Sequence, residues 1–176
     1  MKHIMVDLET MGTSADAAII SIGAVAFDPE RKQWTHKFYC PVDLETSVQA
    51  GMRIDPGTVV WWMRQSDEAR AAVQGGDPLA EALQKFSNFV AAVQNTPDEA
   101  VCIWGNGSDF DNVILATAYR LLGHEQPWKF WNNRCYRTVK NLWDPMGQHF
   151  ERKGAHHNAL DDAFSQAEHL MRIWKD

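Results

Sequence analysis

The chain has 176 residues, of which 45% are hydrophobic and 23% charged, and its formal net charge is −6. These values fit a single domain over residues 1–176 and exclude a disordered chain, a fibrous repeat and a disulfide-held miniprotein. The charge argues against a protein that coats nucleic acid electrostatically. A nucleic-acid enzyme is still compatible with it, because an acidic site that recruits divalent cations reverses its own local potential.

The cysteines and the distribution of apolar residues indicate in which cellular compartment the protein is expected. Cys40, Cys102 and Cys135 are widely spaced and form no CxxC pair, which favours small buried hydrophobes over a disulfide framework or a thiolate zinc site. No run of about 18 apolar residues occurs, and Asp7 interrupts the start of the chain before a signal-peptide segment forms. We therefore expect a cytoplasmic protein without a membrane partner.

The first part of the chain predicts three strands. Residues 3–9 alternate between apolar side chains on one side and Met5, Asp7 and Glu9 on the other, which is the period of a strand. The apolar run 18–27 and the segment 33–40 predict two further strands. The short connections between them favour an antiparallel meander.

The rest of the chain alternates between helices and strands. Apolar spacing predicts helices over residues 56–65, 78–94, 110–121, 136–143 and 160–174, with Gly123 closing the third of them. Residues 100–104 predict a short buried strand. The pattern of residues 127–135 is ambiguous, and a second short strand is one interpretation of it.

Asp7 and Glu9 form the first acidic pair. On one side of a strand their carboxylates lie about 6.5–7 Å apart, from where both reach one metal or each reaches a member of a metal pair. Such hard oxygen ligands suit Mg²⁺ or Mn²⁺. A solvated edge face is the alternative, but the tight loop that begins at Thr10 favours a functional site.

Two later clusters carry acids at expected helix starts. In the segment 106–111, Ser108 is a candidate helix cap with Asp111 completing a capping box. In the segment 154–163, Asn158 and Asp161 form the same pattern. Asp162 lies off the apolar stripe of its helix, so it is not a core position. Capping requires only one of the two adjacent acids, which leaves Asp162 without a structural role. His157 either folds back over a neighbouring site or is a surface or supporting residue.

Together these segments resemble the DEDDh family of 3′-to-5′ exonucleases. The matching motifs occur in family order as Asp7-x-Glu9, Asn106-x3-Phe110-Asp111 and His157-x4-Asp162. The resemblance covers most of the chain and implies an RNase H-like α/β fold, with a mixed central sheet flanked by helices. The segments DLETMGT, Trp61-Trp62 and WGNGSDFDN are most similar to compact RNase T-like and phage or bacterial exonuclease VIII-like members.

The resemblance also implies roles in the reaction. It implies that two divalent ions, Mg²⁺ or Mn²⁺, are bound by four acids, namely Asp7, Glu9, Asp111 and Asp162. It implies that His157 is the general base, which agrees with the titration of imidazole near neutral pH. His156 and Asp161 have the same spacing, but the family text His-x-Ala-Leu-x-Asp-Ala matches His157 and Asp162. The implied product is a nucleoside 5′-monophosphate.

The implied substrate is the 3′ end of single-stranded DNA or RNA. Substrate contacts are expected from Thr10, Met11, Gly12, Trp61, Trp62 and Asn106. Met11 is expected to pack against the last base, and the two tryptophans to offer a stacking surface unless they belong to the core.

Six basic residues lie in the segment before the last motif, and they predict either a phosphate track or a solvated face: Lys129, Arg134, Arg137, Lys140, Arg152 and Lys153. The family also raises the expectation of a homodimer. A non-catalytic module that holds nucleic-acid ends and a nucleotide phosphohydrolase are the competing functions.

Overall fold

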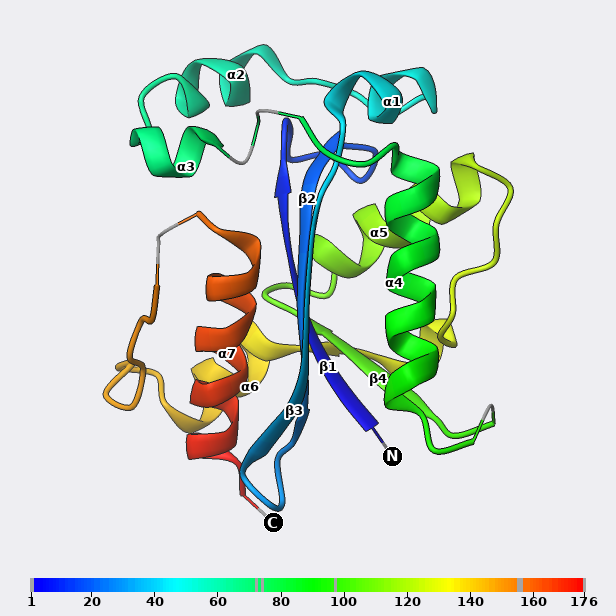
Figure 1. Cartoon of the computed structure of the whole chain (residues 1–176). Helices are drawn as coiled ribbons and strands as arrows, with labels where there is room; N and C mark the ends of the chain where they lie inside the picture. The colour runs from blue at the N-terminus through cyan, green and yellow to red at the C-terminus, as the bar shows by residue number, and fades with distance from the viewer. Residues whose placement is uncertain (1, 72, 74, 97, 155–156, 176) are drawn as a thin grey trace.

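The computed structural model describes residues 2–71, 73, 75–96, 98–154 and 157–175. One sheet with the order β3-β2-β1-β4-β5 forms its centre (Figure 1). The strands are β1 (Lys2–Thr10), β2 (Ile19–Asp28), β3 (Gln33–Pro41), β4 (Val101–Gly105) and β5 (Asn133–Cys135). The first three strands pair antiparallel as the predicted meander, whereas β4 and β5 run parallel to β1. The sheet is therefore mixed, as predicted.

Helices cover both faces of this sheet. They are α1 (Leu44–Gln49), α2 (Pro56–Trp62), α3 (Asp67–Ala71), α4 (Leu79–Val93), α5 (Asp111–Leu121), α6 (Tyr136–Trp143) and α7 (Ala159–Ile173), with a short 3-10 helix, η1 (Phe130–Asn132). Figure 1 shows α4 and α5 on one face, α6 and α7 on the other, and α1 to α3 across one end of the sheet. None of the helices in the described part of the chain is both long and apolar enough to cross a bilayer.

The alternation in β1 separates two hydrophobic cores. Ile4, Val6 and Leu8 lie in the core that includes α4 and α5. Met5 lies in the second core, with buried side chains of α7 such as Ala163. Because Asp7 and Glu9 follow the parity of Met5, they face α7. The predicted alternation is confirmed.

Gly23 controls how closely α7 approaches the sheet. It lies opposite Asp7 in the register of β1 and β2. A Cβ atom at Gly23 would lie 2.1 Å from the carbonyl carbon of Ala159, the first residue of α7. Only glycine leaves room for the first turn of this helix against β2. The close approach brings the acidic first turn of α7 next to Asp7.

The predicted elements are present, and their bounds differ by a few residues. The helix predicted over residues 56–65 ends at Trp62, and the uncertain segment 127–135 contains η1 and β5. Two short helices, α1 and α3, were not predicted. None of the three cysteines forms a disulfide in the described part of the chain. Cys40 and Cys102 are buried as predicted, but Cys135 is partly exposed.

Of the three residues predicted to begin or end helices, two have the predicted role and one does not. Asn158 caps α7, since its side-chain oxygen accepts from the backbone N–H groups of Leu160 and Asp161. Gly123 follows α5 with a φ of +70°, which glycine adopts readily. The capping role of Ser108 is wrong, because Phe110 holds the N-cap position of α5 and makes no side-chain cap bond.

Candidate active site

The acids and the histidine of the three sequence segments meet at one end of the sheet. Asp7 and Glu9 lie in the last part of β1, and Asp111 begins α5, which follows the parallel strand β4 after a short loop. Ligand atoms of Glu9, His157 and Asp162 all lie within 4.8 Å of one another. Asp7 is close enough to Asp111, Glu9 and Asp162 for their charges to shift its pKa. The structure therefore brings the five residues together.

Asp111 ties α5 to β1 and to the residue that follows β4 instead of capping its own helix. Its Oδ1 accepts from the backbone N–H of Leu8 at 3.2 Å, and its Oδ2 accepts from that of Asn106 at 3.0 Å. A Cβ atom at Gly105 would lie 3.0 Å from Asp111 Oδ2. These contacts hold the carboxylate against β1, and they explain why it is unavailable for a capping box.

Asp7 is held by a residue that sequence reasoning missed. Gln166 donates from Nε2 to Asp7 Oδ1 at 2.8 Å. Gln166 is buried and lies one helical turn after Asp162 on α7, so both side chains face β1. The signal in the sequence is the i, i+4 spacing from Asp162, which places a polar side chain on the same face of the helix.

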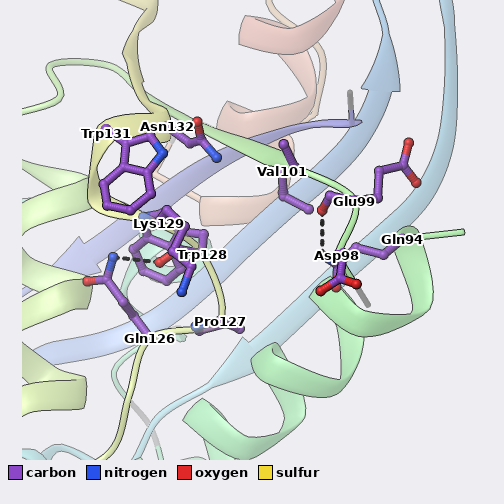
Figure 2. A pocket seen from close by; sticks show the side chains of 11 residues that line it. Gln94, Asp98, Glu99, Val101, Gln126, Pro127, Trp128, Lys129, Trp131 and Asn132 are labelled. Carbon is purple, nitrogen blue, oxygen red and sulfur yellow. Dashed lines mark hydrogen bonds between the residues drawn. The ribbon is translucent and has the colours of Figure 1, made fainter. Parts of the chain in front are cut away.

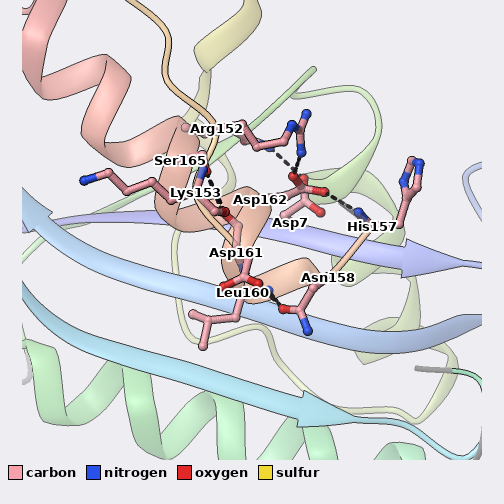
Figure 3. A network of polar contacts seen from close by, with 10 residues as sticks. Asp7, Arg152, Lys153, His157, Asn158, Leu160, Asp161, Asp162 and Ser165 are labelled. Atoms are coloured by element: carbon pink, nitrogen blue, oxygen red, sulfur yellow. Dashed lines mark hydrogen bonds and ion pairs between the residues drawn. The ribbon is translucent and has the colours of Figure 1, made fainter. Parts of the chain in front are cut away.

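Asp162 has a partner at each oxygen (Figure 3). Oδ2 accepts from the backbone N–H of His157 at 3.2 Å, and Oδ1 forms an ion pair with the Arg152 guanidinium. Arg152 was predicted only as part of a basic segment. The rival residue Asp161 points at Gly154, where a Cβ atom would lie 2.2 Å from its carboxylate. The other rival, His156, lies outside the described residues.

His157 stands between the acids and an aromatic wall. Its ring meets that of Trp61 edge to face, with centroids 4.7 Å apart, and Trp62 lies further away at 6.2 Å. Its backbone has a φ of +62°, in the left-handed region that non-glycine residues rarely adopt. Such conformations are kept mostly where the surroundings enforce them, often at functional sites.

Burial disfavours the charged forms of Asp7, Glu9 and Asp111, and repulsion between carboxylates adds to this effect at Asp7 and Glu9. The pKa of Asp7 is raised well above its ordinary value, first by burial and then by Asp111, Glu9 and Asp162. Burial, with the charges of Asp162 and Asp111, raises the pKa of Glu9 to about 8. Burial also raises the pKa of Asp111 to about 7, against the effect of its two backbone N–H donors. Clustered carboxylate oxygens of this kind fit Mg²⁺ or Mn²⁺, which would remove the repulsion.

A cavity of about 390 Å³ opens beside Glu9. Four of the predicted substrate residues line it, namely Thr10, Gly12, Trp61 and Trp62. Trp61 is 41% exposed, whereas Trp62 is buried and donates from its indole to the Thr10 carbonyl at 2.9 Å. Phe110, Asp55 and Thr58 also line the cavity and were not predicted.

Met11 and Asn106 were also predicted to contact the substrate, and the structure places them differently from the four residues that line the cavity. Met11 is only 4% exposed, belongs to the hydrophobic core and is not among the described residues that line the cavity. This burial disfavours the expected packing of Met11 against the last base, and the contact stays a prediction. Asn106 acts through its backbone, which donates to Asp111 and accepts from Arg137 Nη2 at 2.7 Å.

The predicted basic segment does not form one continuous track. Arg152 contacts Asp162, and Arg137 contacts Asn106, so both lie next to the acidic site. Lys153 instead pairs with Glu168 at 2.6 Å, and Arg134 donates to the backbone carbonyls of Trp131 and Asn133.

A second cavity, of about 430 Å³, lies near the beginning of β4, between the segment after α4 and η1 (Figure 2). Its lining includes Asp98, Glu99, Lys129 and Trp131 and none of the clustered acids.

Comparison with known proteins identifies the family. Residues 2–174 match the family described as the 3′-5′ exoribonuclease Rv2179c-like domain. The chain belongs to this family. An exodeoxyribonuclease of Enterobacteria phage T4 is 29% identical over 160 residues, which cover 78% of this chain and 70% of the phage protein.

Solved structures of DEDDh exonucleases share the fold. The nuclease domain of 3′hExo, a DEDDh family member bound to rAMP, has a TM-score of 0.65 at 15% identity and covers 98% of this chain and 90% of its own. Exonuclease I of E. coli, in complex with a dT13 oligonucleotide, has a TM-score of 0.63 at 17% identity, covering 98% of this chain and 40% of its own. These structures confirm the predicted RNase H-like fold as the one that a DEDDh nuclease domain has. The family match confirms the expected enzyme class, a 3′-5′ exonuclease.

Proposed function

We propose that this exonuclease depends on two divalent metal ions and removes nucleotides from the 3′ end of single-stranded DNA or RNA as nucleoside 5′-monophosphates. The observation that carries the proposal is the convergence of four acids and His157 beside a cavity of about 390 Å³. A cavity of this size falls within the range of small-ligand sites and suits one terminal nucleotide.

Asp7, Glu9, Asp111 and Asp162 would hold the ions. Bound there, a metal pair supplies an activated water and stabilises the leaving 3′ oxygen. Gln166 fixes Asp7 through Oδ1 and leaves Oδ2 free of that contact. The two backbone N–H donors fix Asp111, whose carboxylate oxygens retain further lone pairs for a cation. Both acids are thus oriented before any ion arrives.

His157 is the proposed general base. Its ring nitrogen lies within 4.8 Å of carboxylate oxygens of Glu9 and Asp162, which is where the attacking water would stand. Contact with Trp61 limits the orientations of the imidazole ring. A neutral imidazole in this position would accept the proton of the attacking water.

The terminal nucleoside would occupy the cavity. Trp61 offers an exposed aromatic face on which a base stacks without sequence preference, and Phe110 lines the cavity as well. The indole of Trp62 holds the Thr10 carbonyl and thereby shapes the wall. Support for a single-stranded substrate comes from exonuclease I, whose structure contains dT13.

The family description names RNA and the phage relative is named for DNA, so both polymers are proposed substrates. A homodimer and a cytoplasmic location remain predictions from the sequence.

The test uses single-stranded DNA and RNA labelled at the 5′ end, with Mn²⁺, Mg²⁺ or EDTA. The proposal expects stepwise shortening from the 3′ end that EDTA, Asp7→Ala and His157→Ala each suppress. Glu45→Gln, at an exposed acid that accepts a hydrogen bond from Gln49 one helical turn away, is the matched control and should retain activity. Binding of strands without shortening would favour the end-binding module. Cleavage of small phosphate esters without oligonucleotide shortening would favour the phosphohydrolase.

A further inference from the structure

Arg152 pairs with one of the proposed metal ligands. Its guanidinium contacts Asp162 Oδ1, while the other oxygen of Asp162 is engaged by the backbone N–H of His157 (Figure 3). The side chain of Asp162 is 13% exposed and that of Arg152 is 40% exposed. The guanidinium therefore reaches the acid from the solvent side, and it can leave without disturbing buried packing.

The surroundings of Arg152 keep it at the mouth of the site. It belongs to the segment between α6 and α7, and its guanidinium carbon lies 5.8 Å from the centre of the Phe150 ring. The following residue anchors the segment to α7, since the Lys153 N–H donates to Ser165 Oγ at 2.9 Å. When the side chain swings away from Asp162, the anchored backbone holds it near the site entrance.

Charge balance indicates where the guanidinium goes. Two divalent ions would neutralise the four carboxylates, so a guanidinium on Asp162 would then face cations and lose its attraction to the acid. A bound strand brings a phosphodiester to the same place, with one negative charge that the ions do not balance. Arginine matches phosphate oxygens with two parallel N–H donors, and this geometry favours the exchange of partners.

We propose that Arg152 exchanges partners: it pairs with Asp162 in the metal-free chain and binds a phosphate of the nucleic-acid strand once divalent ions occupy the acids. This inference rests on the proposed function. It makes Arg152 a competitor of the metal at Asp162 and a substrate-binding residue in the loaded enzyme. Metal loading thereby prepares the site for the strand.

The first measurement is Mn²⁺ binding by calorimetry, without nucleic acid, for the wild type, Arg152→Gln and Arg172→Gln. Arg172 is the matched control, because its side chain is 39% exposed and pairs with Glu151 and Glu168, away from the clustered acids. Loss of the competing guanidinium should lower the Kd of Arg152→Gln for Mn²⁺ about 2- to 5-fold, which corresponds to a partly exposed ion pair. Arg172→Gln should bind Mn²⁺ like the wild type.

The second measurement is strand shortening at saturating Mn²⁺. Arg152→Gln should raise KM about 10-fold or more with a smaller change in kcat, since a charged hydrogen bond to phosphate is lost. The slope of log KM against log salt concentration should fall by about 0.7, the value for one phosphate contact on a single strand. Arg152→Lys should restore the salt slope but only part of the KM, because lysine keeps the charge and lacks the bidentate fork.

Equal Mn²⁺ affinity and KM in Arg152→Gln and Arg172→Gln would overturn the inference while leaving the proposed function intact. Weaker Mn²⁺ binding by Arg152→Gln would also overturn it, since Arg152 would then support the acid instead of competing for it. If the wild type neither bound Mn²⁺ nor shortened strands, the proposed function itself would fail. Matching thermal unfolding curves in EDTA would show that the variants fold.

Discussion

Replacing Glu9 with Gln should stabilise the metal-free protein while abolishing its activity. Glu9 is 7% exposed, and its pKa is raised from 4.5 to about 8 in the folded chain. The folded protein therefore binds this proton more tightly than the unfolded chain does. The contribution to the free energy of unfolding is complete below pH 4.5 and is lost as the pH rises toward 8.

The size of the effect follows from the same shift. Between the ordinary pKa of 4.5 and pH 7 lie about 2.5 units, which at about 1.36 kcal/mol per unit correspond to about 3 kcal/mol of lost stability. Glutamine has nearly the same shape and carries no charge, so Glu9→Gln should recover up to about 3 kcal/mol at pH 7. At pH 5 the same calculation gives less than about 1 kcal/mol.

Urea unfolding in EDTA at pH 5 and pH 7 measures both values, with the exposed Glu45→Gln as the control expected to change neither. Adding Mn²⁺ should stabilise the wild type more than Glu9→Gln, because the variant lacks one ligand. A Glu9→Gln protein that is no more stable than the wild type at pH 7, or that gains equally at both pH values, would refute the electrostatic reasoning.

Further predictions concern the geometry of the site. Gly23→Ala should destabilise the protein by about 1–3 kcal/mol or more and reduce activity, because a Cβ atom would meet the backbone of α7; thermal unfolding and strand shortening measure this. His157→Ala should lower kcat by about 10²–10⁴-fold, and Asp7→Ala should lower it further because it disturbs metal occupancy; single-turnover rates separate the two. Trp61→Ala should raise KM by about 5- to 100-fold with little loss of stability, since one stacked base contributes about 1–3 kcal/mol. Gln166→Leu should weaken Mn²⁺ binding by about 10- to 100-fold in calorimetry, as expected for a residue that orients a metal ligand.

Local patterns predicted the features that the backbone period determines. The alternation in β1 predicted that Asp7 and Glu9 share a face, since the period of a strand is fixed by its geometry. The helices α1 and α3 were missed, because such short helices depend on tertiary contacts more than on a repeating pattern. In α1, for example, buried Ser47 donates to the Ile19 carbonyl at 2.8 Å, a contact that no local pattern reveals.

Side-chain partners distant in the chain could not be predicted in this way. Asp111 fitted a capping box by spacing, yet its carboxylate bonds to Leu8 on another element. Met11 followed the acidic motif in a loop, but the energy of burying its side chain places it in the core. Arg152 was one of six basic residues, and only the fold distinguishes it from Lys153, which pairs with Glu168. The resemblance to a family predicted the convergence, while the partners that hold each acid required the structure.

Two glycines at which a Cβ atom would clash, Gly23 and Gly105, let helices pack close to the acids of the site. Gly23 admits α7 next to Asp7, and Gly105 admits the start of α5, where Asp111 lies. Each close approach removes water from a carboxylate, and this burial is the largest cause of the raised pKa of both acids. The same desolvation that weakens the metal-free fold strengthens the attraction for a divalent cation, because the charges are poorly screened. Loosening α7 at Gly23 should therefore lower the affinity for Mn²⁺ even in a variant that still folds.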